Sequence, residues 1–376
     1  MKISDLQTPA LILDQGKVIR NTATMTARLA VKGVNLRPHM KTSKSVDVAR
    51  LVLDGNFGGV TVSTLKEAEY FLEHGIGDIV YAVCIAPSKL DHAAALTERG
   101  ADLKVIIDNV EVARAITRHG STFRVLIEID CGEHRTGITS GHPDVLEIAD
   151  LLAASDNAQL AGVMTHAGHS YGCRSVDEIK QIARDERDAV VGAARRLRDA
   201  GHDCPIVSVG STPTATFGEN FSGVTEARPG VFVFYDLFQA GLGVCTTDDI
   251  AVSVLASVIS QNPDHNQILI DAGGLALSKD RSTAALDTDL GYGLVCDADT
   301  GVPINGPDGP LTVAGVHQEH GQIILADSES LKQFPVGTRI RILPNHVCMT
   351  AAAYDRYNVI DGETVIAEWK RCNGWQ

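Results

Sequence analysis

The chain lacks the patterns that mark several protein classes. Its 376 residues contain no basic block and carry a formal net charge of −14, which argues against nucleic acid or an anionic membrane as a partner. No apolar stretch approaches the roughly 20 residues of a membrane-spanning helix. The segment from Met1 to Leu13 also lacks the charged and then apolar run of a signal peptide. The sequence therefore predicts a cytoplasmic protein.

Paired cysteines and nucleotide-binding glycine motifs are absent as well. The eight cysteines are dispersed and none forms a C-x-x-C pair, which in a large chain without a signal peptide is typical of reduced thiols. No G-x-G-x-x-G follows an early strand, and we find no internal repeat or low-complexity tract. The missing glycine motif disfavours an open doubly wound sheet, the main alternative to a barrel.

What the chain does have is a regular alternation of strand-like and helix-like segments. Helix-like stretches include 17–31, 65–74, 89–99, 110–119 and 179–200. Eight strand-like runs alternate with helical ones, at 35–41, 59–62, 79–82, 103–107, 124–129, 160–164, 206–209 and 225–228. Such alternation is typical of parallel β/α packing. Eight units predict an α/β fold with a closed (β/α)8 TIM-like barrel.

The pattern changes beyond Phe238 to short strands between Gly, Pro and Asp turns. The expected strands are 251–259, 267–271, 293–296, 311–316, 322–326 and 339–343. We expect the strand at 8–13 to join them, because the barrel already has its eight strands. The sequence thus predicts two domains, a barrel over residues 14–240 and a C-terminal β-rich domain made of residues 1–13 and 241–376.

Candidate functional residues lie where predicted barrel strands end, which is where such barrels carry their chemistry. The first strand ends in R-P-H-M-K-T, with Lys41 beside His39. An uncharged lysine amine is the group that attacks an aldehyde. An ordinary surface lysine is the alternative interpretation.

The seventh strand is followed by S-V-G-S-T-P-T, which includes Gly210, Ser211 and Thr212. Glycine permits close backbone approach, and hydroxyl and N–H groups suit a phosphate. A plain Gly/Ser turn is the alternative. The motif T-H-A-G-H-S-Y brings His166 and Tyr171 to another strand end, where they suit a flat heterocycle, or else serve as structural residues.

Two further residues have two interpretations each. Arg135, in D-C-G-E-H-R-T-G, offers a bidentate fork to an anion, or pairs with Glu133 or Asp130 to shape its loop. Tyr235 contacts a bound ring or phosphate, or packs in the core.

The late segment P-N-H-V-C holds His346 and Cys348. In an extended segment, residues i and i+2 project to the same face, so the two side chains could chelate one ion. Imidazole plus thiolate favours Zn²⁺ over Mg²⁺ or Ca²⁺. A buried cysteine beside a chance histidine is the alternative.

Taken together, these motifs resemble the fold-type III pyridoxal-phosphate enzymes, in the branch of D-serine dehydratase, D-threo-3-hydroxyaspartate dehydratase and D-threonine aldolase. The resemblance is carried by R-P-H-x-K-T at 37–42, T-H-x-G-x-S-Y at 165–171 and H-x-C at 346–348, with further matches at 62–69, 271–273 and 278–281. It runs from near Thr8 to about Thr350. One departure is Ser43, where many eukaryotic D-serine dehydratases have histidine, and it bears on the substrate more than on the cofactor.

The resemblance implies an alanine racemase-like fold in which Lys41 bonds covalently to pyridoxal 5'-phosphate. It implies a metal on His346 and Cys348, zinc before manganese, cobalt or magnesium. The cofactor-binding residues that it implies, together with the phosphate turn, are Lys41, His39, Arg135, His166, Tyr171, Gly210, Ser211, Thr212 and Tyr235.

The implied activity is that of a lyase, a dehydratase that converts a D-3-hydroxy amino acid into a 2-oxo acid and ammonia. H-x-C, rather than H-x-D, favours dehydration over aldol cleavage to glycine and an aldehyde. An amino-acid racemase and a non-catalytic pyridoxal-phosphate carrier are further alternatives. D-threo-3-hydroxyaspartate, D-serine and D-threonine all stay open as substrates, as do Arg135, Arg174 and Arg281 as partners for a β-carboxylate. Related enzymes are homodimers, so a homodimer is expected.

Overall fold

The computed structural model describes residues 1–375, and the chain divides into two compact units. The barrel unit comprises residues 23–230 with the chain end from Gly374, and the β-rich unit comprises residues 1–22 and 231–373. The sequence-based limits, a barrel over residues 14–240 and a β-rich domain of residues 1–13 and 241–376, remain predictions.

The barrel unit is built on eight parallel strands in the order β2-β9-β8-β7-β6-β5-β4-β3. A parallel bridge between His39 and Thr61 closes the ring, because the Met40 N–H donates to Thr61 O at 2.8 Å and the Thr61 N–H to Pro38 O at 2.9 Å. The predicted barrel is confirmed. Its strands are β2 (Asn35–Leu36), β3 (Val60–Val62), β4 (Asp78–Cys84), β5 (Asp102–Ile107), β6 (Phe123–Ile129), β7 (Ala158–Thr165), β8 (Ile206–Val209) and β9 (Glu226–Ala227).

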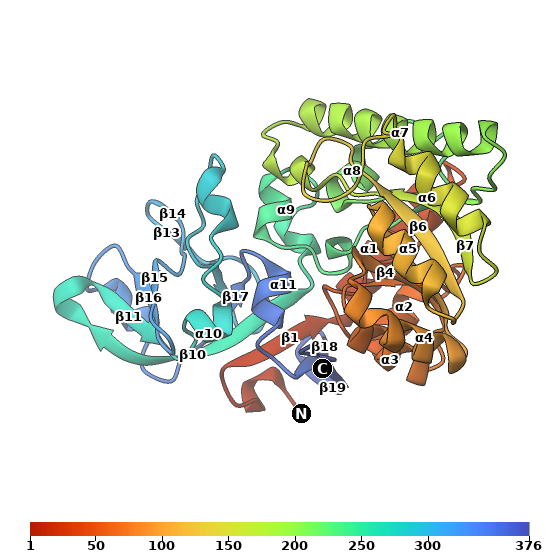
Figure 1. Cartoon of the computed structure of the whole chain (residues 1–376). Helices are drawn as coiled ribbons and strands as arrows, with labels where there is room; N and C mark the ends of the chain where they lie inside the picture. The colour runs from red at the N-terminus through yellow and green to blue at the C-terminus, as the bar shows by residue number, and fades with distance from the viewer. Residues whose placement is uncertain (376) are drawn as a thin grey trace. The chain divides into compact units, whose positions relative to one another are not determined.

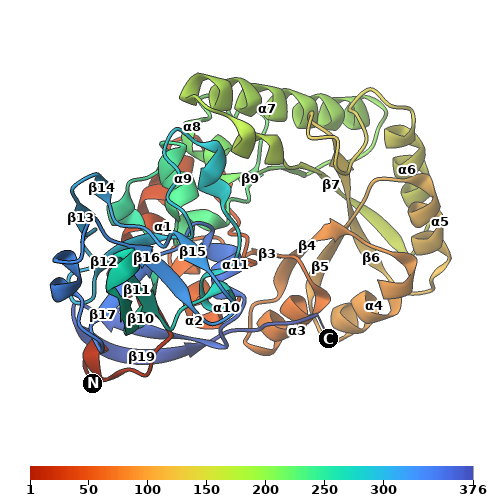
Figure 2. The same ribbon diagram turned by 90° about the vertical axis from the view of Figure 1, so that its left-hand side faces the viewer.

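Helices α4 to α7 lie outside strands β4 to β7 (Figure 2). Several begin at caps that the sequence provides: the Thr64 hydroxyl accepts from Glu67 N–H, and Ser175 with Glu178 forms a capping box. The helices are α1 (Gln15–Ala30), which runs from one unit into the other, α2 (Val46–Leu53), α3 (Leu65–Glu73), α4 (Leu90–Glu98), α5 (Val110–Arg118), α6 (Asp144–Ala153), α7 (Val176–Asp199) and α8 (Thr212–Phe217).

Charged residues gather where several barrel strands begin. Arg37 is buried and pairs with Glu226, the first residue of β9, at 2.8 Å and with Asp78, the first residue of β4, also at 2.8 Å. Lys104 pairs with Asp102 at 2.7 Å and also with Asp78. Buried charges are tolerated only when paired. This network therefore fills the end of the barrel opposite to the carboxyl ends of the strands.

The β-rich unit contains a larger mixed sheet in the order β15-β16-β11-β10-β1-β18-β19, in which β17 pairs with both β10 and β12. Its long hairpin of β10 and β11 is visible in Figure 1. β1 runs antiparallel to β10 and parallel to β18, which confirms that the N-terminal strand joins this sheet. The strands are β1 (Ala10–Asp14), β10 (Val252–Asn262), β11 (Gln267–Ile270), β12 (Leu294–Asp297), β15 (Gly315–Val316), β16 (Gly321–Ile324), β17 (Arg339–Leu343), β18 (Arg356–Asp361) and β19 (Thr364–Lys370), and β13 (Asn305–Gly306) and β14 (Gly309–Pro310) form a separate hairpin.

Two differences from the prediction concern short segments of this unit. The expected strand at 311–316 is reduced to β15, and the hairpin of β18 and β19 was not predicted although Asp361-Gly362 is a strong hairpin signal. Gly362 has a φ of 59°, as such a turn requires. Three short helices complete the unit: α9 (Leu237–Gly241), α10 (Gly274–Leu277) and α11 (Val347–Ala351). Over residues 1–375, no helix has the length and apolar character needed to cross a membrane.

Candidate functional site

A cavity of about 210 Å³ lies at the carboxyl ends of the barrel strands. Predicted site residues from four different strand ends meet in it, although they are far apart in the sequence. Its polar lining residues are His39, Lys41, Ser63, Cys84, Glu128, Arg135, Thr136, His166 and Arg228, and Gly210, Ala82, Val83 and Met164 complete it. The structure therefore brings together His39, Lys41, Arg135, His166 and Gly210. The carboxyl ends of the strands are where such barrels carry their active sites.

The two lysines of the first strand end differ in their partners. The Lys44 ammonium lies 3.0 Å from the buried Glu67 carboxylate, and Lys44 has a φ of 46°. Lys44 therefore stabilises the turn that follows β2. Lys41, which lines the cavity, makes no ion pair with any residue that the structure describes. Its amine is the one available to a ligand.

The two cavity histidines are uncharged at neutral pH. Burial, followed by the positive charge of Lys41, lowers the pKa of His166 to about 3 and that of His39 well below its usual value. His166 Nδ1 is hydrogen-bonded to the Gly210 carbonyl, which requires Nδ1 to carry the proton. His166 Nε2 is then an acceptor.

Arg228 supplies a second fixed cation to the cavity, although no motif in the sequence pointed to it. Its guanidinium is buried and donates to the Ser208 hydroxyl and to the Thr165 carbonyl, while the Ser208 hydroxyl donates to Glu226 at 2.7 Å. The polar groups thus run through the barrel interior from the ionic network to the cavity. Arg135 lines the cavity and also lies 3.3 Å from Glu133. The predicted pairing with Glu133 is therefore present, and the binding of an anion by Arg135 stays a prediction.

The turn after β8 leads into α8, and its polar groups are mostly engaged. Ser211 caps the helix by accepting from Thr214 N–H at 3.1 Å, and the Ser211 and Ser170 hydroxyls lie 2.9 Å apart. A Cβ at Gly210 would lie 2.8 Å from Arg228 N, so glycine is needed for close packing. The Thr212 hydroxyl is buried and has no hydrogen-bond partner among residues 1–375. It is a hydroxyl of this turn whose hydrogen-bonding capacity the described residues leave unused.

Glu186 on α7 orders two of these strand ends and was not predicted. Its Oε1 accepts from the N–H groups of Gly210 at 3.0 Å and Ala167 at 3.1 Å, and burial raises the pKa of its carboxyl. The signal was a glutamate at helical spacing on the apolar face between Ala183 and Val190. Because Glu186 takes the Gly210 N–H, that N–H is not free for a phosphate.

Tyr171 and Tyr235 do not line the cavity. Tyr171 belongs to the short helical turn η3 (Gly168–Gly172), next to Ser170. Tyr235 lies in the β-rich unit, directly after the turn η4 (Val231–Val233), with a φ of 50° and a buried side chain.

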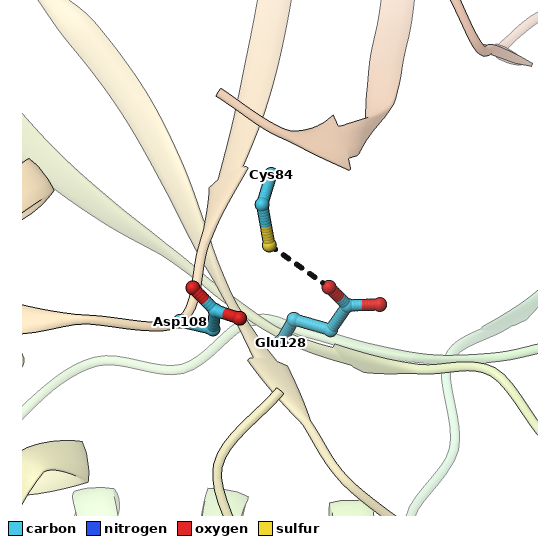
Figure 3. A group of neighbouring side chains, drawn as sticks. All are labelled: Cys84, Asp108 and Glu128. Carbon is cyan, nitrogen blue, oxygen red and sulfur yellow. Dashed lines mark hydrogen bonds between the residues drawn. The ribbon is translucent and has the colours of Figure 1, made fainter. Parts of the chain in front are cut away.

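Cys84, Asp108 and Glu128 come together from three neighbouring strands (Figure 3), and Cys84 and Glu128 line the cavity. Possible ligand atoms of Cys84, Asp108 and Glu128 lie within 4.8 Å of one another, and the Cys84 thiol donates to Glu128 Oε2 at 3.0 Å. Burial and then the negative charge of Glu128 raise the pKa of Cys84, so the thiol stays protonated. The residues come from three separate strand ends and form no sequence motif, which is why they were not predicted.

His346 and Cys348 meet in the β-rich unit, but not in the way the sequence analysis assumed. The expected extended segment is wrong, because His346 caps α11 and Cys348 lies in its first turn. The Val347 N–H donates to the buried Asp236 carboxylate at 3.0 Å and the Asn345 amide donates to Thr283 and Gly291, and these bonds fold the segment into a helix start. The imidazole and the thiol are still hydrogen-bonded to each other.

A carboxylate that the sequence analysis did not assign completes this group. Asp280 Oδ2 lies 2.7 Å from His346 Nδ1. Burial opposes a charged imidazole, but the hydrogen bond that the ring donates to Cys348 and the negative charges of Cys348 and Asp236 outweigh it and raise the pKa of His346 to about 10. Imidazole, thiol and carboxylate are the donors that a transition metal such as zinc prefers.

Residues 13–237 match the family model "Alanine racemase, N-terminal domain", and residues 251–360 match a serine dehydratase domain. A D-threo-3-hydroxyaspartate dehydratase from a Delftia species is 44% identical over 98% of both chains. A D-serine dehydratase from Dictyostelium discoideum is 33% identical over 99% of this chain and 98% of its own. A 3-hydroxy-D-aspartate aldolase from Paracoccus denitrificans is 28% identical over 98% of this chain and 92% of its own.

Solved structures agree with these matches. The Delftia dehydratase superimposes with a TM-score of 0.95 at 44% identity, over 100% of both chains. Its variants with a histidine or a cysteine changed to alanine, the latter in a metal-free form, also give a TM-score of 0.95, at 43% identity. Since one family model covers more than half of the chain and a relative above 40% identity spans nearly all of it, this protein belongs to the alanine racemase N-terminal domain family, in the branch whose barrel is followed by a serine dehydratase domain.

Proposed function

We propose that the protein is a lyase that depends on pyridoxal 5'-phosphate and a divalent metal, and that it dehydrates a D-3-hydroxy amino acid to a 2-oxo acid and ammonia. The observation that carries the proposal is the cavity at the barrel strand ends. There the Lys41 amine lies with two uncharged histidines and two arginines, and it makes no ion pair with any described residue, although Glu128 also lines the cavity. The names of the relatives at 44% and 33% identity support dehydration.

The cavity residues fit the cofactor. Lys41 would hold its aldehyde carbon covalently, and the unpartnered Thr212 hydroxyl would receive its phosphate, with Ser211 and Gly210 shaping the turn. His39 and His166 would lie against its ring as neutral imidazoles. Tyr171 and Tyr235 remain predicted cofactor neighbours. When bound, pyridoxal phosphate supplies an electron-withdrawing ring that stabilises negative charge at a substrate Cα.

The chain's own groups then divide the remaining work. The Lys41 amine is the base that we assign to the Cα proton, since it lines the cavity without an ionic partner. Arg135 is the arginine that we assign to a substrate carboxylate. Of the other candidates, Arg174 donates to the Gly172 and Cys173 carbonyls, and Arg281 pairs with Asp289. Arg135 also lines the cavity, which favours an anionic substrate group there.

We assign the metal to His346 and Cys348, and zinc is the ion that imidazole with thiolate favours; manganese, cobalt and magnesium are the alternatives. A bound metal supplies positive charge that stabilises a leaving hydroxyl. The metal-free solved relative is a cysteine variant, and the histidine and cysteine substituted in that enzyme are two positions apart, as His346 and Cys348 are. This spacing supports the assignment.

Aldol cleavage is the second candidate, because a 3-hydroxy-D-aspartate aldolase is also a relative, at 28% identity. The deciding experiment supplies D-threo-3-hydroxyaspartate, D-serine and D-threonine to the purified enzyme, before and after EDTA. A 2-oxo acid with equimolar ammonia, lost on chelation and restored by zinc, is the expected result. Glycine with an aldehyde would overturn it in favour of the aldolase. Turnover unaffected by EDTA would show that the reaction needs no metal and would contradict that part of the proposal.

We also propose that the protein is a homodimer, and light scattering tests this.

A further inference from the structure

Asp280 is hydrogen-bonded to Nδ1 of the His346 imidazole. It lies just beyond α10, where Ser278 adopts a φ of 72° and its hydroxyl accepts from the Asp280 N–H at 3.0 Å. This turn directs the carboxylate toward residue 346, and Asp280 Oδ2 lies 2.7 Å from His346 Nδ1. The two side chains are about one-third exposed, at 29% and 34%. Both therefore retain access to solvent ions.

Both oxygens of the Asp280 carboxylate are already engaged. Oδ1 accepts from the Ser282 hydroxyl at 2.5 Å, while Oδ2 accepts from His346. With Nδ1 facing a carboxylate, the proton of the imidazole stays on Nδ1. Nε2 is then the ring nitrogen available to a metal, which would replace the second proton that the imidazole carries in the metal-free protein.

We propose that Asp280 is a positioning residue for the metal centre: its hydrogen bond fixes the ring orientation and tautomer of His346 so that Nε2 is presented as the ligand. The inference rests on the proposed metal-dependent function and adds a residue that neither the sequence motifs nor the comparisons assign. Carboxylates that orient metal-binding histidines in this way typically contribute about 10–100-fold to metal affinity.

Asp236 has a different task in the same group. Its Oδ1 accepts from the Gln239 N–H at 2.9 Å and its Oδ2 from the Val347 N–H at 3.0 Å. It therefore orients the backbone at the start of α11 and does not contact the imidazole nitrogen. Of these two aspartates, Asp280 is the one that is hydrogen-bonded to the ring itself.

The test measures zinc affinity directly on the pyridoxal-phosphate-loaded enzyme, by competition with a chromophoric chelator. Asp280→Asn keeps the size of the side chain but removes the charge that holds the Nδ1 proton, and we expect zinc to bind about 10–100-fold more weakly. The visible absorbance of the bound cofactor and the melting temperature of the metal-free protein should not change. Asp264→Asn, an exposed aspartate in the same unit, is the matched control and should bind zinc like the wild type.

A zinc Kd for Asp280→Asn within twofold of the wild type would overturn the inference and leave the proposed function intact. If Asp280→Asn does not fold, Ser282→Ala decides, because it frees Oδ1 without altering Asp280. A severalfold weaker Kd supports the positioning role, and an unchanged Kd contradicts it. A wild-type enzyme that binds no zinc and turns over after chelation would instead refute the metal-dependent function itself.

Discussion

The Glu226 carboxylate and the Arg37 guanidinium form a 2.8 Å ion pair in which neither side chain is more than 5% exposed. The pair joins the last strand of the barrel to the residue that follows the first, across the parallel ladder of β2 and β9. Glu226 also accepts from Ser208, whose hydroxyl in turn receives the Arg228 guanidinium. The pair thus anchors one end of the polar path that reaches the cavity.

Removing one partner of this pair should be costly. We expect Glu226→Ala to lower the free energy of unfolding by about 3–5 kcal/mol, because Arg37 would remain buried with only Asp78 as a partner. Urea denaturation of wild type and variant measures the difference. The control is Arg114→Ala, which removes an exposed pair with Glu147 and should cost about 1 kcal/mol or less. Equal losses of unfolding free energy in the two variants would show that the buried pair stabilises the protein no more than the exposed pair does.

A labelling experiment should distinguish Lys41 from Lys44, because only Lys41 is expected to carry the cofactor. Borohydride reduction followed by peptide mass spectrometry should find the cofactor on Lys41. Lys41→Ala should lose both the adduct and the visible absorbance, and turnover should fall by about 10²–10⁴-fold, the usual contribution of a general base. Lys44→Met should keep the adduct but melt at a lower temperature, since the buried Glu67 loses its ionic partner. An adduct on any other lysine would refute the site assignment.

Two cysteine-containing groups make the metal assignment testable within one chain. His346→Ala and Cys348→Ala should each abolish stoichiometric zinc and dehydration, while cofactor absorbance remains. Cys84→Ser should retain its zinc, because the Cys84 thiol serves as a hydrogen-bond donor to Glu128. Elemental analysis after dialysis reads out all three variants. If Cys84→Ser loses its zinc and Cys348→Ala keeps it, the metal site must be assigned to the group in the barrel cavity instead.

The neutral state of His166 predicts a pH effect on stability. Its pKa is about 3 in the folded protein and roughly 6.5 when unfolded, so between these values only the unfolded chain binds the proton. The stabilisation is fully present above pH 6.5 and is lost as the pH falls toward 3. Wild type should therefore lose roughly 2 kcal/mol more than His166→Gln between pH 7 and 5.

Urea unfolding at the two pH values measures this difference. His92→Gln, at an exposed histidine of the same unit, is the control and should follow the wild type. An equal loss of stability in wild type and His166→Gln would show that the imidazole is already charged in the folded protein.

The alternation of apolar runs and the Gly, Pro and Asp turns were enough to predict the barrel and most strands of the second unit, because periodicity and turn residues are local properties of the sequence. Motifs joined to the family resemblance identified Lys41, His346 and Cys348, and these assignments remain to be tested. Glu186, Arg228 and Asp280 were not assigned, since Gly210, Ser208 and His346, which they respectively contact, lie 24, 20 and 66 residues away along the chain. The helix start at His346 was missed because it depends on Asp236, a residue remote in sequence.

The barrel closes at one of its shortest strands. β2 contributes only two residues to the ladder, and a single bridge at His39 completes the ring two positions before Lys41. The seam of the cylinder and the reactive amine are therefore formed by the same few residues. In a chain whose first strand has not docked, the barrel wall beside Lys41 is open. We therefore expect the proposed covalent loading of Lys41 to require a closed barrel.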